Sequence, residues 1–212
     1  ESTLAVLNLA IADKPEYKKI LADLLSPIRK KYPWSAVTKA ILMERLLWQV
    51  TTAAGENYVR MNAKPRPEIR DLLQTLAVMD VDIKVLSCGY SEWVTPICSA
   101  WGIPAHNVHA SSLIWWRNHA VVFRPDMLAR RDGKRRMISD WYKRGLLRTP
   151  VILVGDGKKE LAAYEAGYGD AFVQANYFVN LQPFACSRPV SFVSDIAHLK
   201  KELESLLGGP TP

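Results

Sequence analysis

The sequence predicts an α/β fold built on a parallel β-sheet, with a helical segment near its start. Short apolar runs, typical of strands buried on both faces, alternate along the chain with segments of helical periodicity. Residues 14–63 show helical spacing and no strand pattern. Strands that alternate with helices form parallel sheets, in which ligands bind beyond the carboxyl ends of the strands.

The first predicted elements are a strand and the helical segment. Residues 4–12 are almost entirely apolar, which predicts a buried strand. Within residues 14–63, apolar side chains then recur three and four positions apart, the spacing of one helix face. These side chains are Tyr17, Ile20, Leu21, Leu24 and Leu25, followed by Val37, Ile41, Leu42, Leu46, Leu47 and Val50.

Strands and helices alternate after residue 64. Pro67 suits the first turn of a helix. The elements expected beyond it are a strand at 81–86, a helix at 91–101, a strand at 150–154, a helix at 160–166 and a strand at 171–173. Polar residues and glycines follow two of these strands, so we expect candidate site residues at the strand ends.

Composition narrows the class of protein. The 212 residues, 49% hydrophobic and 23% charged, are ordinary for a globular protein. No apolar run is long enough to cross a membrane, and residues 1–4 lack the basic flank of a secretory signal. Cys88, Cys98 and Cys186 lack metal-ligand spacing, which favours reduced thiols. We therefore expect an intracellular protein, cytoplasmic or organellar.

A basic segment at residues 124–148 contributes much of the net charge of +7. Three interpretations stay open: a solvated helix face, a site for an anionic small molecule, or a surface that binds nucleic acid through its phosphates. No nucleic-acid-binding motif accompanies the charge, so nucleic acid is the least favoured partner. His106 and His109 lie close in sequence but lack a third ligand for zinc.

Three stretches follow one another in a recognisable order. The first is Lys-Val-Leu-Ser-Cys-Gly-Tyr-Ser at residues 84–91, which follows Arg-Pro-Glu-Ile at 66–69 and precedes Trp-Gly-Ile-Pro at 101–104. The second is Gly133-Lys134, which a predicted helix follows. The third is Val-Gly-Asp-Gly-Lys-Lys-Glu at residues 154–160, at the end of a predicted strand. In this order and spacing they resemble the haloacid dehalogenase (HAD) superfamily, in particular its phosphoserine-phosphatase-like members. The resemblance implies a Rossmann-like core formed by residues 1–13 and 64–212. Residues 14–63 would form a small helical cap inserted after the first strand.

The resemblance also assigns roles to individual residues. Ser87, with Gly89, would bind the phosphoryl group, and Lys134 would balance the charge of phosphate and carboxylates. Asp156 and Glu160 would be the acidic residues that bind Mg²⁺, although the second position is more often aspartate. Carboxylates at a strand end are suitable ligands because Mg²⁺ takes hard oxygen donors.

The family's nucleophile motif, Asp-x-Asp-Gly-Thr after the first strand, has no counterpart in this alignment. It places Asn8 at the nucleophile and Ala10 at the general acid. Asparagine is a poor nucleophile and alanine cannot transfer a proton, so both catalytic functions would be lost. In a shifted register Asp13 would be the nucleophile, whereas a structural interpretation makes Asp13 the N-cap of the next helix.

Three functions therefore remain open. The first, which we favour, is a pseudoenzyme that binds a ligand or a protein. The second is a HAD-fold enzyme with altered chemistry, such as a lyase, isomerase or hydratase. The third is a Mg²⁺-dependent phosphatase that uses Asp13. The expected partner is a small anionic or aromatic molecule in the cleft between cap and core, or a protein. An aromatic ligand is favoured if Trp34, Trp115 and Trp116 line that cleft.

Overall fold

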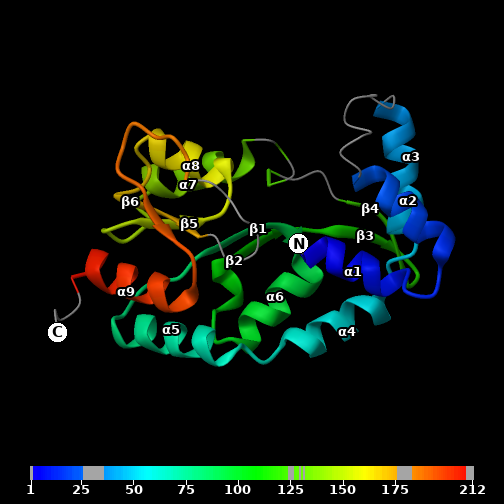
Figure 1. Cartoon of the computed structure of the whole chain (residues 1–212), viewed down its shortest axis with the longest axis horizontal. Coiled ribbons are helices and arrows are strands. Elements are labelled where there is room, and N and C mark those ends of the chain that lie inside the picture. The colour runs from blue at the N-terminus through cyan, green and yellow to red at the C-terminus, as the bar shows by residue number, and fades with distance from the viewer. Residues whose placement is uncertain are drawn as a thin grey trace. The chain divides into compact units, whose positions relative to one another are not determined.

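The computed structural model describes residues 2–25, 36–123, 127–128, 130, 132–175 and 183–208. Contacts divide the chain into two compact units, the first formed by residues 1–64 and 84–126 and the second by 65–83 and 127–212. The elements, shown in Figure 1, are α1 (Ser2–Ala10), α2 (Pro15–Leu25), α3 (Ala36–Leu47), α4 (Thr52–Asn62), α5 (Pro67–Val78), β1 (Val85–Tyr90), α6 (Ser91–Ala100), the 3-10 helix η2 (Ala105–Asn107), β2 (Val108–Ser111), β3 (Leu113–Trp116), β4 (His119–Phe123), α7 (Gly133–Lys143), β5 (Ile152–Gly155), α8 (Lys158–Glu165), β6 (Ala171–Ala175), β7 (Ser191–Val193) and α9 (Ile196–Leu206).

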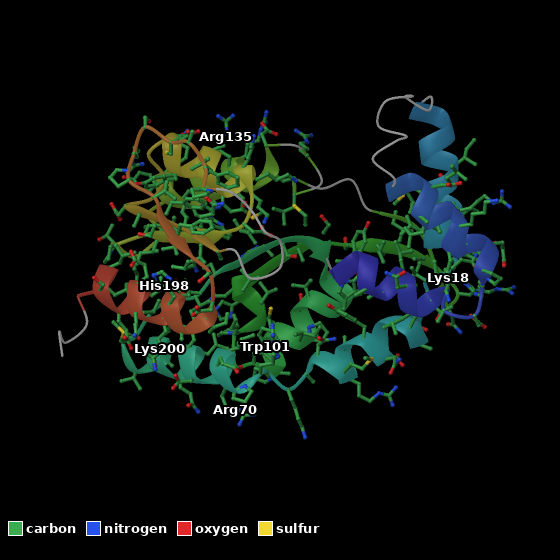
Figure 2. The ribbon with its side chains drawn as sticks, in the orientation of Figure 1. Lys18, Arg70, Trp101, Arg135, His198 and Lys200 are labelled. Carbon is green, nitrogen blue, oxygen red and sulfur yellow. The ribbon has the colours of Figure 1, made fainter. Side chains whose placement is uncertain are left out.

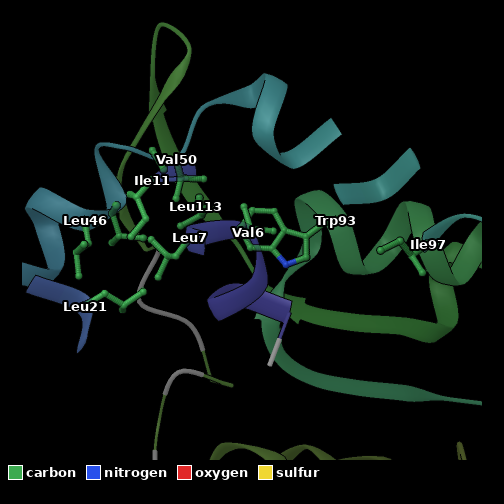
Figure 3. Close-up of a cluster of buried hydrophobic side chains, with 11 residues drawn as sticks. Val6, Leu7, Ile11, Leu21, Leu46, Val50, Trp93, Ile97 and Leu113 are labelled. Carbon is green, nitrogen blue, oxygen red and sulfur yellow. The ribbon is translucent and has the colours of Figure 1, made fainter. Parts of the chain in front are cut away.

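The first apolar run forms a helix, so the expected strand at residues 4–12 is wrong. These residues belong to α1 and the turn that follows it. Val6, Leu7 and Ile11 are buried in the core of the first unit, as Figure 3 shows. Leu7 and Ile11 are four residues apart and lie on one helix face. A short apolar run suits a buried helix as well as a buried strand, and here packing on several sides decides for the helix.

The core of the first unit joins helices to a β-hairpin. Its buried side chains are Val6, Leu7, Ile11, Leu21, Leu46, Leu47, Val50, Trp93, Ile97, Leu113 and Ala120. The antiparallel strands β3 and β4 form the hairpin, which the apolar pattern had not revealed. His119 attaches it to the end of α3, because its Nδ1 lies 2.8 Å from the Trp48 carbonyl oxygen and the two rings stack at 5.0 Å.

Strands β1 and β2 form a parallel pair in the same unit. The strand expected at residues 81–86 lies further along the chain, at Val85–Tyr90. Val81 and Ile83 pack instead against the core of the second unit. As a result Ser87 lies within the strand, and the pairing with β2 becomes irregular between Ser87 and Tyr90.

The second unit is a parallel three-stranded sheet with helices on both faces. The strands are ordered β5–β6–β7. Successive residues of β6 point to opposite faces: Phe172 packs with α8, whereas Val173 packs with α5 and α9. Parallel sheets are normally covered on both faces in this way. The predicted α/β class is confirmed, and α6, β5, α8 and β6 lie close to their expected positions.

The helical character of residues 14–63 is confirmed where the structure describes them, in α2, α3 and α4. The two compact units differ from the expected core and cap, because α1 and β1 to β4 join these helices in the first unit. That residues 14–63 act as a cap stays a prediction. Across the described ranges no helix is long and apolar enough to cross a membrane.

Trp93, in α6, is the largest fully buried side chain of the first unit, and its indole N–H has no hydrogen-bond acceptor among the described residues. We expect Trp93→Ala to lower the free energy of unfolding by about 3–5 kcal/mol, the usual cost of truncating a buried aromatic side chain. Trp93→Phe should cost far less, because it also removes a buried donor that is unpaired. Denaturant unfolding followed by circular dichroism tests this; equal losses in both variants would contradict it.

Asp195 is the N-cap of α9, and its carboxylate accepts a hydrogen bond from the backbone N–H of His198 at 2.7 Å. That bond holds the pKa of Asp195 below its usual value. The ionised carboxylate therefore stabilises the fold fully above its unfolded pKa of about 3.9, and the contribution is lost as pH falls through the lower folded value. Unfolding of wild type and Asp195→Asn across acidic pH should show a stability difference that shrinks on acidification, since asparagine caps without a charge. A difference independent of pH would contradict this.

Candidate functional site

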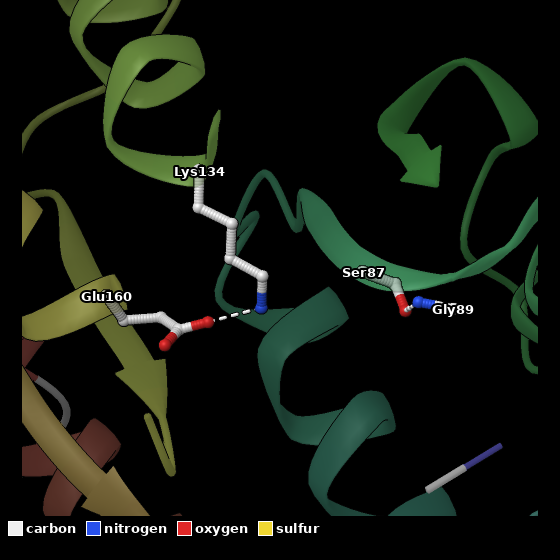
Figure 4. Close-up of polar contacts among 4 residues, drawn as sticks. All are labelled: Ser87, Gly89, Lys134 and Glu160. Carbon is white, nitrogen blue, oxygen red and sulfur yellow. Dashed lines mark hydrogen bonds and ion pairs between the residues drawn. The ribbon is translucent and has the colours of Figure 1, made fainter. Parts of the chain in front are cut away.

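Lys134 and Glu160, two of the predicted site residues, form an ion pair in the second unit (Figure 4). Lys134 is the second residue of α7, and Glu160 lies in the first turn of α8. Only 15% of the lysine side chain and 12% of the glutamate side chain are exposed. A glutamate is favourable in a first helical turn, where the helix dipole is positive. The sequence predicted both residues, but not their direct contact.

The turn before α8 is shaped around Glu160. Residues Gly155-Asp156-Gly157 connect β5 to this helix. A Cβ atom at position 155 would lie 2.7 Å from Glu160 Cγ, and one at position 157 would lie 2.8 Å from its Oε2. The glycines therefore leave the space in which the glutamate side chain folds back over the strand end.

Gly133 has a comparable role at the start of α7. A Cβ atom there would lie 1.9 Å from the Met127 carbonyl oxygen and 2.9 Å from Leu128 Cα, both backbone atoms that cannot rotate away. The helix thus begins in close contact with the backbone at residues 127–128. This contact fixes the position of Lys134, the next residue along the helix.

Asp156 is exposed in the turn at the carboxyl end of β5, and it forms no ion pair with the described residues. Its carboxylate and that of Glu160 fit Mg²⁺, which proteins often hold through one or two carboxylates together with waters and substrate phosphates. The pairing with Lys134 already offsets the charge of Glu160. Asp156 is therefore the stronger candidate ligand of the two.

Ser87 lies on β1 in the first unit, and its Oγ accepts a hydrogen bond of 3.0 Å from the backbone N–H of Gly89 (Figure 4). This bond lies where the pairing of β1 with β2 becomes irregular. Irregular strand positions of this kind are frequent beside functional sites. The bond uses an acceptor position of the hydroxyl, so the Ser87 O–H stays available to donate to an anionic ligand.

The predicted nucleophile positions do not lie at a strand end. Asn8 is exposed on α1, and Ala10 packs against the core of the first unit. Asp13 is exposed in the turn between α1 and α2, so the shifted-register interpretation is also wrong in placing it after a strand. The backbone carbonyl of Lys14, not a side chain of Asp13, accepts the first helical bonds of α2. Because the strand expectation fails, the alignment on which the loss of catalysis rested fails with it.

No group of three or more His, Cys, Asp or Glu side chains is placed to hold a metal within the part of the chain that the structure describes. His109 has a lowered pKa, because of burial first and the nearby charge of Lys84 second. The three cysteines form no disulfide among the described residues, and burial raises the pKa of the Cys98 thiol. These groups therefore add no further candidate centre.

Two tryptophans of the first unit donate hydrogen bonds that help hold its elements together. Trp115 Nε1 lies 3.3 Å from Glu92 Oε1 and donates to it, and Trp101 Nε1 donates to the Asn62 carbonyl oxygen at 2.9 Å. Trp116 is 63% exposed. Trp34 and, in the basic segment, residues 124–126, 129 and 131 lie outside the described residues.

Comparison with known proteins agrees with this arrangement of motifs. No family model matches the chain. The chain is 26% identical over 108 residues to the chloroplastic phosphoserine phosphatase of Arabidopsis thaliana, a match that covers 50% of this chain and only 37% of that enzyme. A phosphoserine phosphohydrolase-like protein from Francisella tularensis superposes with a TM-score of 0.68 at 20% identity, over 96% of this chain and 93% of that one. The chain has a phosphoserine-phosphatase-like fold.

A second solved structure supports the same conclusion. A substrate-bound phosphoserine phosphatase superposes with a TM-score of 0.66 at 14% identity, over 97% of this chain and 91% of that one. The predicted resemblance to phosphoserine-phosphatase-like HAD proteins is thereby confirmed. At these identities the structural likeness concerns the fold, and fold alone does not determine activity.

The close contact at Gly133 gives a direct test of how this fold positions Lys134. We expect Gly133→Ala to lower the free energy of unfolding by about 1–3 kcal/mol, because the backbone at residues 127–128 must shift to admit a methyl group. Gly55→Ala is the matched control, since a Cβ in that helix would lie 3.7 Å from Trp93 Cε3, an ordinary contact. It should leave stability unchanged or raise it by up to about 1 kcal/mol through better helix propensity. Equal effects in thermal unfolding would argue against the close contact.

Proposed function

We propose that this chain binds a small phosphate monoester through Lys134 and does not hydrolyse it. The observation that carries the proposal is the half-buried Lys134–Glu160 pair at the carboxyl end of β5, where ligands of parallel sheets bind. The likeness to phosphoserine phosphatases supports a phosphoryl group as the ligand. The absence of hydrolysis is proposed because Asp156 and Glu160 are the only carboxylates on this turn of the described structure; Glu160 is paired with Lys134, and Asp156 is assigned to Mg²⁺.

Lys134 suits a phosphoryl group because its ammonium is held in place before the ligand arrives. A lysine side chain loses considerable rotamer freedom when it is ordered, and its pairing with Glu160 has already imposed that loss. A phosphate oxygen can replace or share the carboxylate as acceptor, since the ammonium has three donors. Hydrogen bonds to charged groups are stronger than neutral ones, so the lysine would dominate binding.

Asp156, with Glu160, would hold Mg²⁺ in this proposal. The bound ion supplies positive charge that neutralises and polarises the phosphoryl group. If Glu160 turns toward a cation, Lys134 gains a free donor for the phosphate, so the two ligands should bind cooperatively.

Isothermal titration with O-phosphoserine and with inorganic phosphate, in the presence and absence of Mg²⁺, tests the proposal. Wild type should bind more tightly with Mg²⁺ present. Lys134→Met should weaken binding by about tenfold or more, since a charged hydrogen bond contributes about 1.5–3 kcal/mol. Lys200→Met is the control: its Nζ is also paired, 2.7 Å from Asp71 Oδ2 in the same unit. Equal losses in the two variants, or no binding by wild type, would overturn the proposal.

A parallel assay of aryl phosphate hydrolysis separates binding from catalysis. We expect no turnover above that of the Asp156→Asn variant. Turnover that Asp156→Asn and Lys134→Met both abolish would instead establish a phosphatase whose nucleophile sequence reasoning did not identify.

A further inference from the structure

Helix α7 carries a second feature, on a face that does not include Lys134. A pocket of about 320 Å³ lies along its exposed side in the second unit. Its lining side chains are Arg135, Arg136, Ser139, Asp140, Lys143 and Tyr168. Figure 2 shows Arg135 on the outer side of its unit.

The helical period explains why this face is separate. Arg135, Ser139 and Lys143 are successive residues four apart and therefore form one row along the helix. Ile138 is buried and Lys134 contacts α8, so these two side chains mark the inward face. At about 100° per residue, the row is turned well away from that inward face.

Along this face of α7, some cationic side chains are paired with a carboxylate and others are not. The Asp140 carboxylate pairs with Arg144 Nη1 at 3.1 Å, and the Asp132 carboxylate pairs with Arg136 Nε at 2.5 Å. The bond from Arg136 also holds the pKa of Asp132 below its usual value, so this partner stays ionised. Arg135 and Lys143 have no ion-pair partner among the described residues. The pocket therefore presents two positive charges that its own carboxylates do not offset.

The remaining lining groups suit an ester with a planar ring. The Ser139 hydroxyl offers a neutral donor between the two cations, and the terminal nitrogens of Arg136 stay available because Nε makes its bond to Asp132. Tyr168 is half-buried, and its ring is supported by Tyr142 at a centroid distance of 5.8 Å. A supported aromatic ring at a pocket edge is a surface on which a base can stack.

We propose that this outer face of α7 is an anion site for a phosphate monoester that bears an aromatic ring, of the mononucleotide class. Two unbalanced cations match the dianionic charge of a monoester, whereas a nucleic-acid backbone phosphate is a monoanion. A nucleic acid also needs a run of successive cations along its strand. The described pocket offers one cluster on one helix, which favours a single small ester.

Titration with adenosine 5′-monophosphate at low ionic strength tests this site in the full chain. Arg135→Gln/Lys143→Gln should weaken binding by about tenfold or more, from the loss of two charged contacts. The charge-matched control is Arg70→Gln/Lys201→Gln, which removes two exposed cations from α5 and α9 of the same unit and should leave the affinity nearly unchanged. Equal weakening by both double variants would show a general effect of net charge and overturn the proposal.

Two further measurements distinguish this site from its alternatives. Binding that is lost in Lys134→Met but retained in Arg135→Gln/Lys143→Gln belongs to the strand-end site, and it overturns the outer-face proposal while leaving the proposed function intact. A short oligothymidine that binds through Arg135 and Lys143 more tightly than the mononucleotide would replace the small ester by nucleic acid. Failure of the mononucleotide to bind at millimolar concentration would also overturn the proposal. Inorganic phosphate that competes with the mononucleotide, with lower affinity than the ester, is the expected result.

Discussion

The ion pair between Lys134 and Glu160 is the interaction on which the candidate site depends. It joins the start of α7 to the first turn of α8, so that each helix limits the other's movement at the end nearest the carboxyl end of β5. Two close approaches make the pair geometrically feasible. The turn at Gly155 and Gly157 leaves room for the glutamate, and Gly133 allows α7 to begin against the backbone at residues 127–128. Three glycines and one pair of opposite charges thus account for the local shape.

A partly buried ion pair is weak evidence for stability, because desolvation of both groups offsets much of their attraction. A functional explanation is more economical. In the proposed function, this charged pair is held ready for a ligand that brings both negative and positive charge, as a phosphate ester with a divalent cation does. The outer face of α7 differs from this pair in its charge balance. Each aspartate there is already paired with an arginine, so the charges that remain unpaired are all positive.

Local pattern was sufficient for much of the fold, and it singled out Lys134 and Glu160 as candidate site residues. The alternation of apolar runs with segments of helical periodicity predicted the parallel α/β arrangement. The same reasoning failed at residues 4–12, where an uninterrupted apolar run carries no period and only tertiary packing distinguishes helix from strand. It also failed at the β3–β4 hairpin. The first turn residue, Arg117, has a φ of 52°, a conformation for which glycine or asparagine is the usual sequence signal, so the turn was not predicted. The Lys134–Glu160 contact spans 26 positions and has no local signature.

The path of the chain through the second unit has a consequence for the order in which that unit can assemble during synthesis. Helix α5 enters this unit at residue 67, and the chain then contributes residues 84–126 to the first unit before it returns. Leu72 and Leu76 pack with Val173 of β6 and with Leu199 and Leu203 of α9, and the bond between Lys200 and Asp71 spans 129 positions. A chain emerging from the ribosome therefore presents the apolar face of α5 until β6 and then α9 have been made. Contacts of such long range slow folding and leave apolar surface exposed in the meantime. This helix is therefore a segment that a chaperone could protect during synthesis.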